Sequence, residues 1–142
     1  MSRNVRMNTR GVVKSVSNAS VPAMMKCGYL VQRKAVKLLG EQKGGGKMVV
    51  RYRPRRTHRV GPPGQPPTTD QAQLANSIFV ASDQGIAGRS QVVVGPTIKY
   101  GKVHEFGVGR MPKRPFMSPA LRQTVKEFPK RFANLPLREP GL

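Results

Sequence analysis

The stretch SVPAMMKCGYLVQRKAVKLLG, residues 20–40, carries the clearest periodic pattern in the chain. Its apolar and small residues recur at helical spacing and form one stripe: Met24, Cys27, Gly28, Val31, Ala35, Leu38 and Leu39. Ser20 is a candidate N-cap, Pro22 suits the first turn, and Gly40 ends the pattern. The stretch predicts a long amphipathic helix that packs against a core. A membrane-surface helix is the alternative, although its apolar face lacks the Trp or Phe that anchors such helices.

The middle of the chain predicts short strands and an extended connector. Residues 47–53 indicate a strand that ends at a proline, and residues 55–59 indicate a basic loop. The Pro-rich residues 61–67 favour neither helix nor central strand, because proline lacks the N–H donor and restricts φ. Strands are expected at 77–81 and 91–94, close enough in sequence to pair as an antiparallel hairpin.

The C-terminal part predicts a second helix. Ser118 is its candidate N-cap, Pro119 fits the first position, and Pro129 should end the helix near Phe128. The segment from Tyr100 to Phe106 is ambiguous between helix and strand.

The predicted fold class is α+β, with a long N-terminal amphipathic helix, a small mainly antiparallel sheet and a C-terminal helix. Residues 20–135 should form one domain. They follow a basic N-terminal arm at 1–19, expected to be extended over 1–17, and precede a C-terminal tail at 136–142.

Charge limits the partners that this chain can have. It carries 26 Lys and Arg against 6 Asp and Glu, a formal net charge of +20. Self-repulsion on this scale favours a nearby polyanion or acidic protein, and a solvated basic face is the alternative. The candidate contacts with DNA or an acidic partner are Arg3, Arg6, Arg10, Arg51, Arg53, Arg55, Arg56 and Arg59.

Side chains suited to catalysis are few. The six acids form no paired-carboxylate signature, and the neighbours His104 and Glu105 point in different directions, so they do not predict a dyad. Two histidines and one cysteine cannot furnish a tetrahedral metal site without distant carboxylates. Cys27 is expected to be a buried structural thiol, and His58 an incidental loop residue or a phosphate contact. We therefore expect no enzymatic activity, no catalytic or metal-binding residues and no cofactor.

Three stretches, in this order, carry a resemblance to a known family. They are GPPGQPPTTD at 61–70, followed by Leu74 and residues 76–78; VGP at 94–96, followed by YGKVHEFG at 100–107; and MPKRPFMSPAL at 111–121. Together they resemble the tailed-phage neck or tail-completion family, short virion-morphogenesis proteins that join head and tail. The resemblance covers roughly residues 20–132. The chain departs from the family pattern around residues 70–72, and its basic arm and residues 51–59 exceed that pattern.

The resemblance implies a non-enzymatic structural protein of the virion. Such a protein forms a closed ring in the neck or connector, joins the DNA-filled head to the tail and lets the genome pass. Its expected partners are copies of itself and neighbouring head-completion, connector, tail terminator or tube proteins, with no membrane. Double-stranded DNA in the channel is a further candidate partner. The expected location is the head–tail junction of the virion, and the host cytoplasm during assembly.

The same stretches supply candidate subunit-interface or docking residues, namely Tyr100, Glu105, Phe106, Arg110, Arg114 and Phe116. Phe116 either packs within the chain or contacts a neighbouring subunit. Glu105 is expected to form a salt bridge with a nearby cation. The alternative function is a basic RNA- or DNA-binding protein of a cellular ribonucleoprotein or nucleoid particle.

Overall fold

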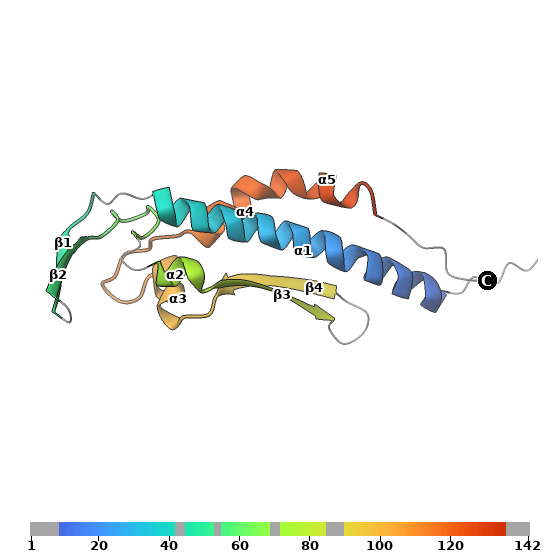
Figure 1. Cartoon of the computed structure of the whole chain (residues 1–142), viewed down its shortest axis with the longest axis horizontal. Helices are drawn as coiled ribbons and strands as arrows, with labels where there is room; N and C mark the ends of the chain where they lie inside the picture. Colours follow the sequence, from blue (N-terminus) through green and yellow to red (C-terminus); the bar gives the residue numbers. More distant parts are fainter. Residues whose placement is uncertain (1–8, 42–44, 53–54, 69–71, 85–89, 136–142) are drawn as a thin grey trace, which may run out of the picture.

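The computed structural model describes residues 9–41, 45–52, 55–68, 72–84 and 90–135. In chain order the elements are α1 (Thr9–Glu41), β1 (Met48–Tyr52), β2 (Arg55–Arg59), α2 (Gln73–Asn76), β3 (Ile78–Gln84), β4 (Ser90–Pro96), α3 (Lys99–Phe106), α4 (Met117–Thr124), the 3-10 turn η2 (Val125–Glu127) and α5 (Phe128–Phe132). Helix α1 runs along the molecule between the β3–β4 hairpin and helices α4 and α5, and the β1–β2 hairpin projects beyond its C-terminal end (Figure 1). The fold is α+β, as the sequence predicts.

Helix α1 begins earlier than the sequence pattern predicts. It starts at Thr9, so Ser20 is not its N-cap and Pro22 lies in its interior. The expectation of an extended arm is therefore wrong from residue 9 onward, whereas residues 1–8 lie outside the described residues. Val12, Val16, Ala19 and Ala23 continue the stripe at helical spacing, which the valine pattern alone did not reveal. One internal proline removes a single hydrogen bond, and the helix continues on both sides of it.

The predicted apolar stripe of α1 packs against the β3–β4 hairpin. Cys27 and Gly28 are buried, as are most of the stripe residues that follow them. A Cβ atom at Gly28 would lie 2.7 Å from Val80 Cγ1 and 2.9 Å from Val92 Cγ1, closer than real Cβ contacts allow. The glycine therefore permits the close approach of the helix to the sheet. No helix in the described part of the chain is long and apolar enough to cross a membrane.

Two antiparallel hairpins make up the sheet structure. Strands β3 and β4 pair with Ile78 opposite Pro96 and Val80 opposite Val94, so the predicted hairpin is confirmed, with longer strands than expected. The prediction of a basic loop at 55–59 is wrong, because this segment is strand β2 and pairs with β1, Met48 opposite Arg59. A segment that follows a strand so closely can satisfy its backbone groups by folding back on it. The ambiguous segment 100–106 is helical, within α3.

The C-terminal helix is divided into α4, η2 and α5. Phe116, rather than Ser118, occupies the N-cap position of α4. The helix ends at Thr124, before the predicted break near Phe128, and Pro129 lies in the first turn of α5. Pro129 has no N–H for a hydrogen bond to the carbonyl of Val125, and the chain tightens into a 3-10 turn at that point.

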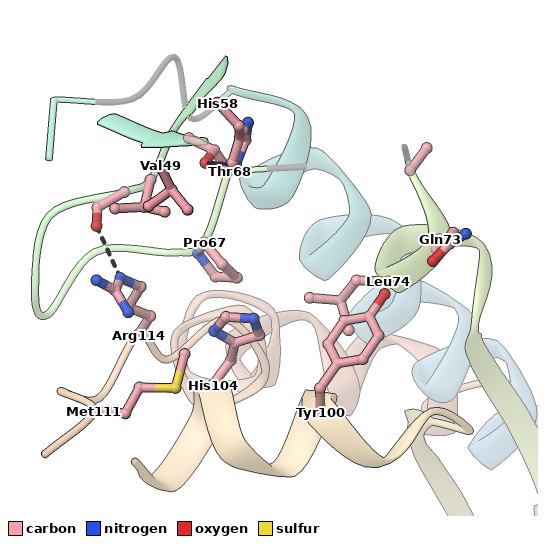
Figure 2. Close-up of a pocket in the computed structure, with 13 residues that line it drawn as sticks. Val49, His58, Pro67, Thr68, Gln73, Leu74, Tyr100, His104, Met111 and Arg114 are labelled. Carbon is pink, nitrogen blue, oxygen red and sulfur yellow. Dashed lines mark hydrogen bonds between the residues drawn. The ribbon is translucent and has the colours of Figure 1, made fainter. Parts of the chain in front are cut away.

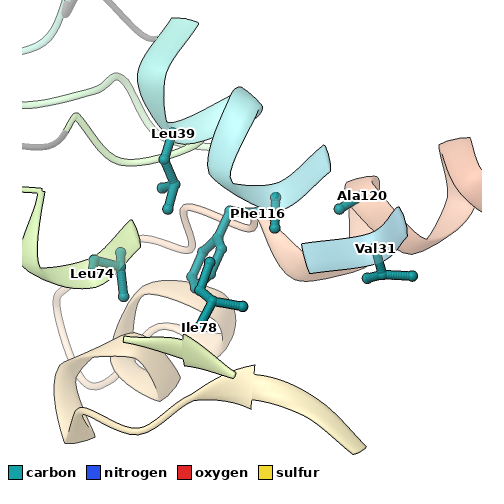
Figure 3. Packing of buried hydrophobic residues seen from close by; sticks show 7 residues of the cluster. Val31, Leu39, Leu74, Ile78, Phe116 and Ala120 are labelled. Atoms are coloured by element: carbon teal, nitrogen blue, oxygen red, sulfur yellow. The ribbon is translucent and has the colours of Figure 1, made fainter. Parts of the chain in front are cut away.

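The hydrophobic core lies where α1, α2, β3 and α4 meet (Figure 3). Its buried residues are Val31, Ala35, Leu39, Leu74, Ile78, Phe116 and Ala120. Phe116 is 0% exposed at the centre of this cluster. It therefore packs within the chain, which is one of the two alternatives that the sequence left open, and it helps to dock α4 on the core rather than contact a neighbouring subunit. The segment before α4, which ends in Phe116, thus positions that helix against α1.

Candidate functional site

Glu105 of α3 holds the N-terminal end of α4. Its Oε2 atom accepts hydrogen bonds from the backbone N–H groups of Phe116, at 2.9 Å, and Met117, at 3.0 Å. Its Oε1 atom accepts the N–H of Ser118 at 2.9 Å and also bonds the Ser118 hydroxyl. The first N–H groups of a helix have no partner within the helix. Glu105 supplies these partners from another element, and so fixes α4 relative to α3.

The expected salt bridge of Glu105 is not the interaction that the structure contains. Among the described residues, the ion pair present joins Lys37 and Glu41, both exposed on α1. Burial acts to raise the pKa of the Glu105 carboxyl. The hydrogen bonds from the Ser118 hydroxyl and the three backbone N–H groups outweigh burial and place this pKa below its ordinary value. The carboxylate is therefore an internal helix cap rather than a group available to a neighbouring subunit.

Arg114 ties the Pro-rich connector to the segment before α4. Its Nε atom donates to the carbonyl oxygen of Gly61 at 2.8 Å, and its backbone N–H donates to the carbonyl of His104 at 2.7 Å. Next to it, the carbonyl of Lys113 accepts the N–H of Gly64 at 2.8 Å. The three stretches that carry the family resemblance are thus joined by direct hydrogen bonds. Arg114 is half-buried and, like Glu105, has an internal structural role.

A cavity of about 430 Å³ lies between the β1–β2 hairpin, the connector, α2 and α3 (Figure 2). Both histidines of the chain line it, together with Thr68, Tyr100 and Arg114. The Oγ1 atom of Thr68 lies 2.9 Å from Nε2 of His58, and the rings of Tyr100 and His104 meet edge to face at 5.9 Å. His58 therefore belongs to strand β2 and faces this cavity, which the interpretation as a loop residue did not anticipate.

The side chain of His104 lines this cavity in its uncharged form. Its Nδ1 atom is buried and has no hydrogen-bond partner among the described residues. Burial, and then the charge of Arg114, lower the pKa of His104 below its ordinary value, so the imidazole is neutral at pH 7. Glu105 faces α4 instead, so the two neighbours form no dyad. Among the described residues, no three His, Cys, Asp or Glu side chains gather closely enough to hold a metal ion.

The candidate cationic residues are divided between the two ends of the molecule. Arg10 lies in the first turn of α1, about 46 Å along the helix from its last residue, Glu41. The β1–β2 hairpin lies beyond that other end (Figure 1). The side chains of Arg55 and Arg59 are described and exposed on β2. For Arg10, Arg51 and Arg56 only the backbone is described, and Arg3, Arg6 and Arg53 lie outside the described residues.

The β1–β2 hairpin presents a mixed basic and apolar surface. Tyr52 is opposite Arg55 in the register and is 77% exposed, while Met48 is exposed opposite Arg59. Paired residues of an antiparallel ladder share a face of the hairpin. An aromatic ring and a guanidinium are thus neighbours on a projecting element, an arrangement that suits contact with an anionic partner.

Of the candidate interface residues, three remain accessible. Phe106 is 66% exposed, and Tyr100 and Arg110 are also exposed.

Sequence reasoning missed a second hollow, between β4, α3 and α4, which Met117 and Leu121 help to line. The exposed position of Leu121, near the edge of β4 that does not pair with β3, follows only from the tertiary structure. Comparison of the chain with protein-family models, curated proteins and solved structures finds no match.

Proposed function

We propose that this chain is a structural virion protein of a tailed phage, which forms a ring in the neck that joins head to tail. The observation that carries the proposal is the way the resemblance-bearing stretches meet. Arg114 bonds the connector at Gly61, and Glu105 caps α4. The residues that resemble the family therefore belong to one structural unit rather than to scattered loops.

The distribution of accessible residues suits a ring subunit. A closed ring needs two different faces of each subunit to meet. Phe106 and Tyr100 on α3 supply exposed aromatic surface for such a contact. The β1–β2 hairpin is a separate projecting element, which in a ring would extend toward DNA in the channel or toward an acidic neighbour. No substrate turnover is part of this role.

The test is made in phage particles that lack the gene for this protein. The expected result is accumulation of DNA-filled heads and separate tails, with joining restored when the wild-type chain is supplied. Electron microscopy of the restored particles should locate the protein as a ring at the junction. Infectious virions that contain no copy of the chain would refute the proposal.

A charge-reversal pair tests the role of the hairpin. Arg55→Glu combined with Arg59→Glu should leave heads and tails joined but impair retention or ejection of DNA. The matched control is Lys126→Glu with Lys130→Glu, two exposed cations near α5. Loss of joining in the hairpin variant alone would assign these arginines to a protein partner.

The projecting basic hairpin also favours the second candidate, an RNA- or DNA-binding protein of a cellular particle. Arg55 next to the exposed ring of Tyr52 could contact a phosphate and a base together. This function requires tight binding of the purified chain to duplex DNA or RNA, with affinity that falls steeply with salt. Negligible affinity across a salt titration would eliminate it.

A further inference from the structure

An apolar groove of about 650 Å³ runs between strand β4 and helices α3 and α4. Val31, Val94 and Phe116 contribute to its lining from the core side, and Met117 and Leu121 line it from α4. Leu121 of α4 is a large apolar residue and is 47% exposed. The groove is therefore hydrophobic surface that the described part of the chain leaves uncovered.

Next to the groove, β4 has an outer edge that no other strand of the described part of the chain pairs with. The N–H of Thr97 donates to the carbonyl of Ser77 at 3.0 Å, which makes these two residues a hydrogen-bonded pair that continues the β3–β4 register. Hydrogen-bonded and non-hydrogen-bonded pairs alternate along an antiparallel ladder. Val92 and Val94 are therefore non-hydrogen-bonded positions, and their N–H and C=O groups point away from β3.

The two outer edges of this hairpin differ. On β3, the carbonyl of Ile78 accepts a hydrogen bond from Nε2 of Gln32 at 2.6 Å, so α1 covers the edge at that point. On β4, no hydrogen bond from the described residues reaches the outward groups of Val92 and Val94. An open strand edge beside an apolar groove is the arrangement that binds an extended peptide as an added strand.

Charge indicates which kind of segment would bind there. Lys99 and Lys102, both exposed, line the α3 side of the groove. The nearby acid, Glu105, is already bonded to the N–H groups of α4. A second copy of a chain with net charge +20 would bring further positive charge to this surface. A segment with acidic side chains would instead be attracted to it.

We propose that the groove binds an extended acidic segment of another protein, which adds to the edge of β4 as a third strand. Its backbone would exchange hydrogen bonds with Val92 and Val94. Alternate apolar side chains would enter the groove, and acidic side chains would lie near Lys99 and Lys102. The inference depends on the strand edge and its charges. The inference does not depend on the proposed neck function, and it would hold for any other function of the chain.

The test uses the full-length, isotope-labelled protein and a synthetic eight-residue peptide of alternating valine and glutamate. Binding should slow hydrogen exchange at the amides of Val92 and Val94 about tenfold or more, while the amide of Val80 on the other edge is unchanged. Combining Lys99→Glu with Lys102→Glu should weaken binding about tenfold or more at low salt. A peptide of alternating valine and lysine should not bind.

Two proline variants separate edge pairing from general damage. Val92→Pro removes an outward N–H of β4. Ser82→Pro removes the outward N–H of β3 at the position directly opposite in the register. Neither change removes a β3–β4 ladder bond. Peptide binding should be lost in the first variant and kept in the second, with circular dichroism confirming that both are folded.

A modified peptide keeps the test independent of variant folding. N-methylation of alternate valines removes the peptide's own donors and should abolish binding to the wild-type protein. Equal binding of the methylated peptide, or unchanged exchange at Val92 and Val94, would overturn strand addition. Equal binding of the lysine peptide would overturn the acidic specificity. If the same amides are protected in the protein alone and the protein self-associates, a second copy fills the groove, and this result would overturn the choice of a foreign partner. None of these readouts depends on virion assembly.

Discussion

Replacing Glu105 with glutamine tests whether this carboxylate fixes α4 to α3. The change keeps the shape of the side chain, removes its charge and turns an amide NH₂ group toward backbone N–H donors. Loss of a helix cap costs about 1 kcal/mol, and loss of a charge at a helix N-terminus about 0.5–1 kcal/mol. A buried N–H left without a partner, here that of Phe116, adds about 1 kcal/mol or more. Because Glu105 is half-buried, we expect a net loss of about 2 kcal/mol.

Urea denaturation followed by circular dichroism measures this loss. For a domain of this size the free energy of unfolding falls by about 2 kcal/mol per molar urea, so the midpoint should drop by about 1 M. The control is Glu41→Gln, which breaks the exposed pair with Lys37 and should cost less than about 0.5 kcal/mol. Equal midpoints for the two variants would refute the capping argument.

The stability difference between wild type and Glu105→Gln should depend on pH. The pKa of Glu105 is lower in the folded chain than the unfolded value of about 4.3. The stabilisation from the carboxylate is therefore fully present above that unfolded pKa and is lost as the pH falls through the folded pKa. The difference in the free energy of unfolding between wild type and Glu105→Gln should narrow as the pH falls from the unfolded pKa through the folded pKa. A constant difference down to acid unfolding would contradict it.

Three further substitutions test the packing and the cavity. Gly101→Ala places a Cβ in a clash with Cγ of Pro96, a rigid ring, and should cost about 1–3 kcal/mol in urea unfolding, whereas Gly95→Ala meets no atom within 4 Å. Phe116→Ala should cost about 3–5 kcal/mol and the exposed Phe106→Ala less than about 0.5 kcal/mol, so similar midpoints would contradict the core assignment. The pKa of His104 is lowered in the folded state, so wild-type stability should decline as the pH falls below the unfolded value of about 6.5. His104→Phe should reduce that decline, and an unchanged profile in thermal unfolding would contradict a neutral buried imidazole.

The proposed function and the inferred groove use surfaces of the molecule that overlap only in part. The β1–β2 hairpin takes part in the neck proposal alone, whereas α3 is shared, because its exposed Phe106 also lines the groove. The edge of β4 serves the binding of a foreign acidic segment. Charge-reversal variants of Arg55 or Lys99 therefore separate the two, because each alters one surface and leaves the core unchanged.

The sequence by itself determined those parts of the fold that local periodicity encodes. The apolar stripe of residues 24–39 predicted the face of α1 that is buried, because helical spacing places those side chains on one side. The short apolar segments 77–81 and 91–94, close together in the sequence, predicted the β3–β4 hairpin. The class α+β followed from these elements.

Only the tertiary structure decided how the sparse acidic and histidine side chains are used. Sequence proximity suggested cations as partners of Glu105, but its partners are N–H groups of the first turn of α4, more than ten residues away. The strand identity of 55–59 depends on pairing with β1, and the open edge of β4 depends on which side of the hairpin α1 covers. Such contacts join distant segments, and local periodicity carries no information about them.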